Sequence, residues 1–157
     1  MVQKVLISFA LLVGVASAEQ INVPVSMRQH NTPDGSCAHA ALVTTLRYEG
    51  RADEAAQWWA THRGGEWPAK LDKEMSDAGL EYVQTLTGGL NFIEGANAAG
   101  YLVEVEVNAD KVTHALLITD IDANYVRIID VNHIKSDWRM RRSDFLDVWT
   151  GWAFYVK

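Results

Sequence analysis

Cysteine and positive charge are both scarce in this chain. Cys37 is the single cysteine among 157 residues, so no intramolecular disulfide can form. Lysine and arginine number 14 against 20 acidic residues, which gives a net charge of −6. The one basic cluster, 139–142, is flanked by acidic residues and predicts a solvated edge. We therefore expect neither nucleic acid nor an anionic membrane surface as a partner.

Internal repeats, low-complexity tracts and linkers are absent from the sequence, which favours a single domain. Nearly half of the residues are hydrophobic (48%) and six are tryptophan, a composition typical of a folded globule.

The first 18 residues have the pattern of a secretory signal peptide. A short start with one positive charge, Lys4, precedes the apolar run 5–15, and Ala16-Ser17-Ala18 matches a small-x-small cleavage site. The alternative is an uncleaved membrane anchor, but the run is too short to span a bilayer comfortably. We predict a signal peptide at 1–18 and a domain at 19–157 that is secreted or periplasmic, without stable membrane insertion after the leader is removed.

The mature chain changes its hydrophobic period midway, which predicts an α+β fold. Helical spacing comes first and strand-like runs follow. The predicted helices are 36–47, 53–61, 68–78, 90–99 and 143–148, and the predicted strands are 81–85, 102–107, 114–121, 125–130 and 151–156. The strands 114–121 and 125–130 are separated by Asp122-Ala123-Asn124 and should form a hairpin.

Cys37 is placed where a loop turns into a helix, because turn-forming residues precede it and small apolar residues follow. Free backbone N–H groups and the helix dipole at such an end favour a thiolate. His114 and Asp130 lie far downstream, at the start and end of the predicted hairpin strands. A lone thiol with a distant histidine and aspartate is the pattern of a cysteine nucleophile with an oriented base.

These segments resemble those of papain-like cysteine peptidases. Gly35-Ser36-Cys37 is similar to the nucleophile motif, and the segments 113–118 and 125–130 are similar to the strands of the base and its orienting residue. The small size, the Asp130 orienter and the segment 143–151 are closest to the bacteriocin-processing peptidases that cut double-glycine leaders. The resemblance implies N-terminal helices, including the nucleophile helix, packed on a C-terminal antiparallel sheet.

Four residues are predicted to carry the chemistry. Cys37 would be the nucleophile, His114 the base and Asp130 the residue that fixes the imidazole. Gln29 would donate its side-chain amide to the oxyanion, beside the N–H of Cys37. In the resembling family, the glutamine lies closer to the cysteine than the eight residues seen here.

Each assignment has an alternative. His114 could be a core histidine, Asp130 a turn residue, and Gln29 an exposed loop residue. Asn132 could orient His114 in place of Asp130, because it would be nearly level with the histidine in a strict hairpin register.

No metal or organic cofactor is implied. Cys37 and His39 are too close in sequence for a good zinc chelate, and one cysteine makes a structural zinc site improbable. We predict an exported thiol-dependent hydrolase, a cysteine peptidase acting on a peptide or protein substrate. The alternatives are another thiol acyl-transfer enzyme, such as a peptidoglycan amidase or a transglutaminase-like enzyme, and an inactive peptidase fold that serves as a binding module.

Overall fold

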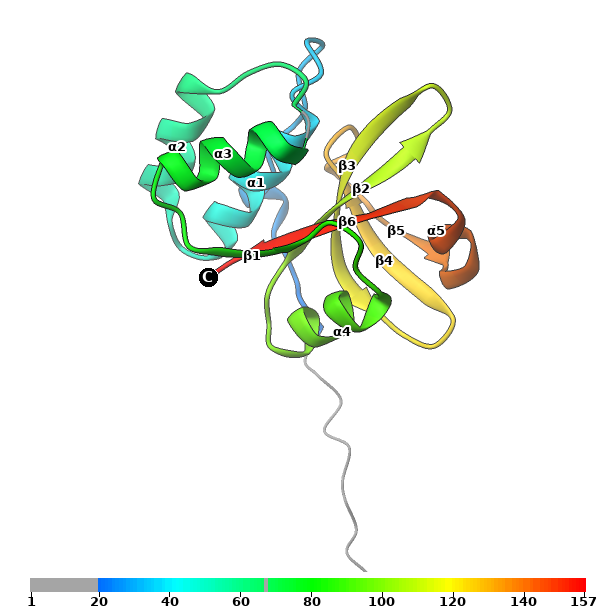
Figure 1. The fold of residues 1–157 in the computed structure, drawn as a ribbon. Coiled ribbons are helices and arrows are strands. Elements are labelled where there is room, and N and C mark those ends of the chain that lie inside the picture. Colours follow the sequence, from blue (N-terminus) through cyan, green and yellow to red (C-terminus); the bar gives the residue numbers. More distant parts are fainter. Residues whose placement is uncertain (1–19, 67) are drawn as a thin grey trace, which may run out of the picture.

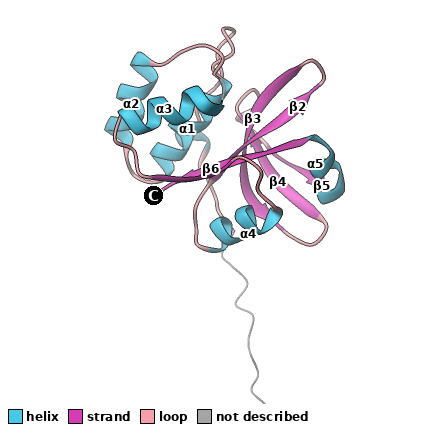
Figure 2. Ribbon diagram, in the orientation of Figure 1, coloured by secondary structure: helices cyan, strands magenta, loops and turns pink. Residues whose placement is uncertain are grey.

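The computed structural model describes residues 20–66 and 68–157; the predicted signal peptide, 1–18, lies outside them. A six-stranded antiparallel sheet in the order β1-β6-β2-β3-β4-β5 forms the centre of the molecule. Three helices, α1, α2 and α3, gather on one side of it (Figure 1), and the short helices α4 and α5 lie apart from them (Figure 2). None of the helices in the described ranges has the length and apolar character needed to cross a membrane.

The elements follow the predicted order. The helices are a 3-10 turn at Val25–Met27, α1 at Cys37–Tyr48, α2 at Ala52–Thr61, α3 at Pro68–Asp77, α4 at Leu90–Ala98 and α5 at Arg142–Val148. The strands are β1 at Tyr82–Thr85, β2 at Val103–Ala109, β3 at Val112–Ile121, β4 at Tyr125–Asp130, β5 at Asp137–Arg141 and β6 at Trp149–Val156. The predicted α+β class, with helices before the sheet, is confirmed.

Helix α1 is the most deeply buried helix of the fold. Every residue from Ala38 to Leu46 is buried, because α2 packs on one side of the helix and the sheet lies on the other. Ala40 and Ala41 are fully inaccessible and, being small, allow close packing. The first residue of this buried helix, Cys37, is therefore held firmly at the edge of the core.

The hairpin of β3 and β4 forms as predicted. The Asp122 carboxylate closes its turn by accepting hydrogen bonds from the backbone N–H groups of Asn124 and Tyr125, both at 2.7 Å. The register pairs Leu116 with Asp130 and Leu117 with Ile129. This register brings the start of β3 near the end of β4.

Two features differ from the expectations. In the strand predicted at 102–107, Glu104 and Glu106 alternate with valines, a pattern typical of a half-buried strand. Glu104 is instead completely buried, because β2 is a central strand with packed side chains on both faces. The basic cluster forms most of the edge strand β5, which sequence analysis missed; its residues are mostly exposed, as a solvated edge should be.

Candidate active site

The turn before α1 sets the position of Cys37. Gly35 has a φ of +87°, a left-handed conformation that favours glycine. Asp34 Oδ1 accepts hydrogen bonds from the Ser36 backbone N–H at 3.2 Å and from the Ser36 hydroxyl at 2.5 Å. The Cys37 N–H donates to the Gly35 carbonyl at 2.8 Å. Ser36 occupies the N-cap position without a side-chain capping bond; Asp34 holds the turn instead.

Strands β3 and β4 bring His114 and Asp130 together. His114 Nε2 lies 2.7 Å from Asp130 Oδ1, and the carboxylate also accepts the Asn132 backbone N–H at 2.8 Å. His114 and Cys37 line the same cavity, and the interaction of the imidazole with the thiol lowers the pKa of Cys37. The three residues thus form a continuous chain of contacts from the start of α1 to the end of β4.

The contacts among Cys37, His114 and Asp130 favour the charged forms of the thiol and the imidazole. Burial raises the pKa of the Cys37 thiol, but the His114 hydrogen bond and backbone bonds from Ala115 and Ala38 outweigh it, so the pKa is lowered overall. Burial lowers the pKa of His114, yet hydrogen bonds to Asp130 and Cys37 raise it to about 9. A lowered pKa of the thiol together with a raised pKa of the neighbouring imidazole is typical of a thiolate–imidazolium pair.

The Asp130 carboxylate supports that pair as an anion. Burial raises its pKa, but hydrogen bonds from His114, the Asn132 backbone and His133 lower the pKa to about 2. Its second oxygen, Oδ2, lies 3.1 Å from His133 Nδ1. The turn after β4 is also held by Asp130, whose backbone carbonyl accepts the His133 N–H at 2.8 Å, so Asp130 has in addition the turn role that was its alternative assignment.

Asn132, the alternative orienter, also touches His114. Its Nδ2 lies 3.4 Å from His114 Nε2, but an amide N–H2 is a donor and faces a ring nitrogen already engaged with a carboxylate. The Asn132 side-chain oxygen, Oδ1, accepts from Asn31 Nδ2 at 2.9 Å instead. The geometry therefore favours Asp130 over Asn132 as the acceptor for His114.

Gln29 lies apart from this constellation. Its side-chain Nε2 donates to the His30 carbonyl at 3.1 Å and its Oε1 accepts from Arg47 Nη2 at 3.0 Å. It does not line the cavity that contains Cys37. The Cys37 N–H is also engaged, with Gly35, so both predicted oxyanion donors are bonded within the protein in this structure.

The cavity beside Cys37 has a volume of about 190 Å³ and is lined by residues of both the helical side and the sheet. Its apolar wall includes Ala38, Pro68, Leu71 and Trp152. The remaining described lining residues are Gly35, Cys37, Gly65, Glu66, Glu106, Thr113, His114 and Ala115. Sequence analysis did not identify Glu66 or Glu106 as site residues.

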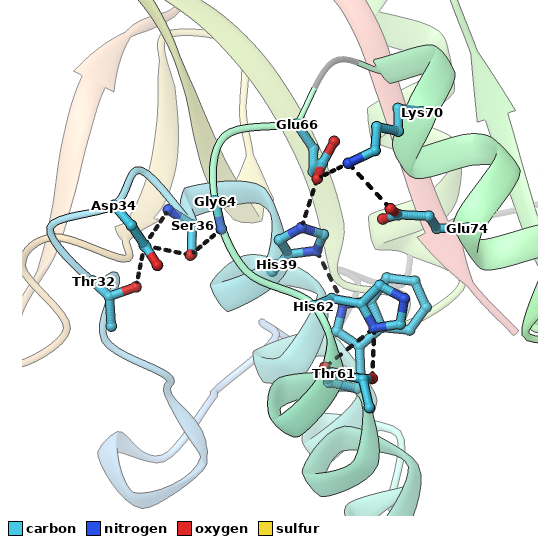
Figure 3. Close-up of polar contacts among 11 residues, drawn as sticks. Thr32, Asp34, Ser36, His39, Thr61, His62, Gly64, Glu66, Lys70 and Glu74 are labelled. Atoms are coloured by element: carbon cyan, nitrogen blue, oxygen red, sulfur yellow. Dashed lines mark hydrogen bonds and ion pairs between the residues drawn. The ribbon is translucent and has the colours of Figure 1, made fainter.

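A second polar cluster shares Glu66 with the lining of the cavity (Figure 3). His39, Glu66 and Glu74 could together offer three metal-ligand atoms within 4.8 Å of one another. However, Trp58 Nε1 donates to His39 Nδ1 at 3.2 Å, which places the proton of a neutral His39 on Nε2, the atom facing Glu66 at 3.6 Å. A protonated Nε2 cannot bind a metal.

Lys70 already supplies positive charge to this cluster. Its ammonium contacts the carboxylates of both Glu66 and Glu74. Burial lowers the pKa of His39, which keeps its ring neutral. The cluster is thus a structural clamp that holds the segment 62–66 against α1. The same segment is also bound by the Ser36 hydroxyl, which accepts a hydrogen bond from the Gly64 N–H at 2.8 Å.

Comparison with known proteins identifies the fold. No family model and no curated protein matches the sequence. Among solved structures, the peptidase domain of Streptococcus ComA, a bifunctional ABC transporter, is 15% identical with a TM-score of 0.64, covering 82% of this chain and 95% of that domain. A C39-like peptidase from Bacillus anthracis is 13% identical with a TM-score of 0.65, and the match covers 88% of this chain and 98% of that one.

A third structure is a double-glycine-motif protease from an AMS/PCAT transporter, solved with its leader peptide. It is 19% identical with a TM-score of 0.63, covering 87% of this chain and 93% of that one. The chain therefore has the fold of papain-like, C39-type cysteine peptidase domains, as the sequence resemblance predicted. At sequence identities of 13–19%, the structural similarity establishes the fold alone.

Proposed function

We propose that this protein is an exported cysteine peptidase that hydrolyses peptide bonds through Cys37, His114 and Asp130. The observation that carries the proposal is the chain of contacts from the Cys37 thiol through the imidazole to the Asp130 carboxylate. The peptidase fold supports it, and the leader peptide bound by the AMS/PCAT protease is consistent with a peptide substrate here.

The chemistry follows from the charges. The Cys37 thiolate attacks the carbonyl carbon of the substrate, and the electron pair of the C=O bond moves to the oxygen. The His114 imidazolium then gives its proton to the leaving amine as the C–N bond breaks. Water, deprotonated by the now neutral His114, attacks the acyl carbon; the C–S bond breaks, and the thiolate–imidazolium pair is restored.

The oxyanion requires donors that are engaged elsewhere in this structure. Gln29 Nε2 would have to leave the His30 carbonyl, or the Cys37 N–H would have to leave Gly35, before either could face the substrate oxygen. We retain Gln29 as the proposed side-chain donor, and substrate binding would supply the reorientation.

Turnover measurements test the proposal. The purified chain 19–157 is incubated with unfolded protein and, separately, with cell-wall fragments, and new amino termini are quantified. Cleavage of protein that is lost in Cys37→Ala supports a peptidase. Cleavage confined to cell-wall fragments would replace it with a peptidoglycan amidase, and no turnover on either would favour a binding module.

A further inference from the structure

Two carboxylates line the cavity beside Cys37, although the catalytic chemistry uses neither of them. Glu106 projects from β2, where its strand partner on β3 is Ala115, the residue next to His114. Glu66 belongs to the segment before α3. Among the described lining residues, the one cationic group is His114, whose charge is balanced by Cys37 and Asp130.

The Glu66 carboxylate is only partly satisfied. Its side chain is 4% exposed, and Oε1 is bonded by Lys70. Its other oxygen, Oε2, is buried and has no hydrogen-bond partner within the described part of the chain. Lys70 is shared with Glu74, so one ammonium serves two carboxylates. A buried carboxylate oxygen without a donor is incompletely compensated, so a positive charge brought close to it is favourable.

Glu106 provides the second negative charge. No ion pair joins it to any residue of the described chain, and its side chain is half-buried. The pairing of β2 with β6 shifts register between Val105 and Val107, at Glu106. Such irregularities re-aim side chains next to active sites, and here Trp152 of β6 lines the same cavity.

The cavity combines these charges with an apolar wall. Pro68, Leu71 and Trp152 suit an aliphatic stem, and the carboxylates suit a cation at its end. Its volume of about 190 Å³ is below that of sites for drug-sized ligands, roughly 300–1,000 Å³, and fits one amino-acid side chain. Lysine and arginine have this combination of a long apolar stem and a positive head.

We propose that the cavity is a specificity pocket for a lysine or arginine side chain next to the bond that Cys37 attacks, with Glu106 as the main determinant and Glu66 as its support. The inference rests on the proposed function, because it assigns a substrate class to the same thiol. It concerns binding of the side chain and adds no chemical step.

Irreversible inactivation tests it without requiring turnover. Dipeptidyl acyloxymethyl ketones carry lysine, norleucine or glutamate at the first or second residue from the reactive ketone. Norleucine keeps the aliphatic stem of lysine and lacks the ammonium. We expect lysine to inactivate about 10-fold faster than norleucine at one of the two positions, the effect of one charged hydrogen bond, and glutamate to be slowest.

Three variants locate the effect. Glu106→Gln should abolish the preference for lysine over norleucine, and Glu106→Lys should make glutamate the faster side chain. Glu94→Gln is the matched control, because Glu94 lies on α4 and pairs with Arg142, outside the cavity. Its preference should equal that of the wild type.

The outcomes separate the two proposals. Equal rates for lysine and norleucine at both positions, or a preference that survives Glu106→Gln, would overturn the specificity pocket and leave the peptidase proposal intact. Failure of every reagent to modify Cys37 would instead overturn the proposed function, and the pocket assignment with it.

Discussion

His114 reaches Asp130 diagonally across a hairpin. The ladder pairs Asp130 with Leu116, two residues beyond His114, yet Nε2 of the imidazole lies 2.7 Å from the carboxylate. Diagonal neighbours on one face of an antiparallel pair are separated by about 7–8 Å, a gap that a histidine and an aspartate side chain together can span. Asn132 lies beyond the end of β4, where the chain leaves the strand.

Replacing Asp130 tests its electrostatic role. Asp130→Asn keeps the shape but removes the anion that raises the pKa of His114, so activity should fall sharply and Cys37 alkylation should require a higher pH. Asn132→Ala is the matched comparison and should be much milder. A nearly silent Asp130→Asn beside a damaging Asn132→Ala would assign the orienting role to Asn132.

The hairpin and the nucleophile helix were predictable because their signals are local. Turn residues 122–124 and flanking apolar runs define β3 and β4, and the small residues after Cys37 define α1. Contacts that depend on tertiary packing were not predictable. Glu104 occupies a place typical of an exposed strand residue, and only the position of β2 between two other strands explains its burial.

The side-chain contacts of loop residues could also not be predicted from the sequence. The position of Gln29, eight residues before Cys37, predicted an oxyanion donor, but the sequence does not show that Arg47 is close enough to bind the side-chain oxygen of Gln29. Glu66 precedes a helix like many exposed acidic residues, and its burial results from the clamp with His39 and Lys70.

Gln29→Ala tests the oxyanion prediction. Loss of one such donor costs about 100- to 1,000-fold in kcat, so we expect a large decrease in kcat with little change in KM. Arg47→Met is the control: it removes the donor that holds the side-chain oxygen of Gln29 and should not lower kcat. Near-normal turnover of Gln29→Ala would leave the role to backbone N–H groups.

Export is tested by the amino terminus of the mature protein. If residues 1–18 are a signal peptide, material recovered from outside the cytoplasm should begin at Glu19, after the Ala16-Ser17-Ala18 site. Edman sequencing or intact mass identifies the end, and Ala18→Pro should block processing as a control. Extracytoplasmic protein that still begins at Met1 would indicate an uncleaved anchor.

Glu104 should make the fold less stable as the pH rises. Complete burial raises its pKa well above the usual value, and the nearby Cys37 raises it further. A raised pKa in the folded state means that the stabilising effect of the proton is complete below the unfolded pKa of 4.5 and is lost above it. One such group changes stability by up to about 1.4 kcal/mol per pH unit.

Urea unfolding between pH 5 and pH 8 measures this effect. Glu104→Gln should flatten the decline in stability, because its side chain does not ionise. Glu106→Gln, on the same face of β2 but half-buried, is the matched control and should follow the wild type. Parallel curves for the wild type and Glu104→Gln would show that Glu104 is not held neutral by the fold.

The reactivity of Cys37 as a function of pH tests the central claim most directly. Iodoacetamide alkylation is followed by intact mass, and any single adduct is on the sole cysteine. With the pKa of His114 at about 9 and that of Cys37 lowered, the wild type should alkylate rapidly at mildly acidic pH, while His114→Ala should react slowly until the pH becomes alkaline. His30→Ala, an exposed histidine, is the control and should match the wild type. Alkylation of the wild type that requires alkaline pH, with the same profile in His114→Ala, would contradict an activated thiolate.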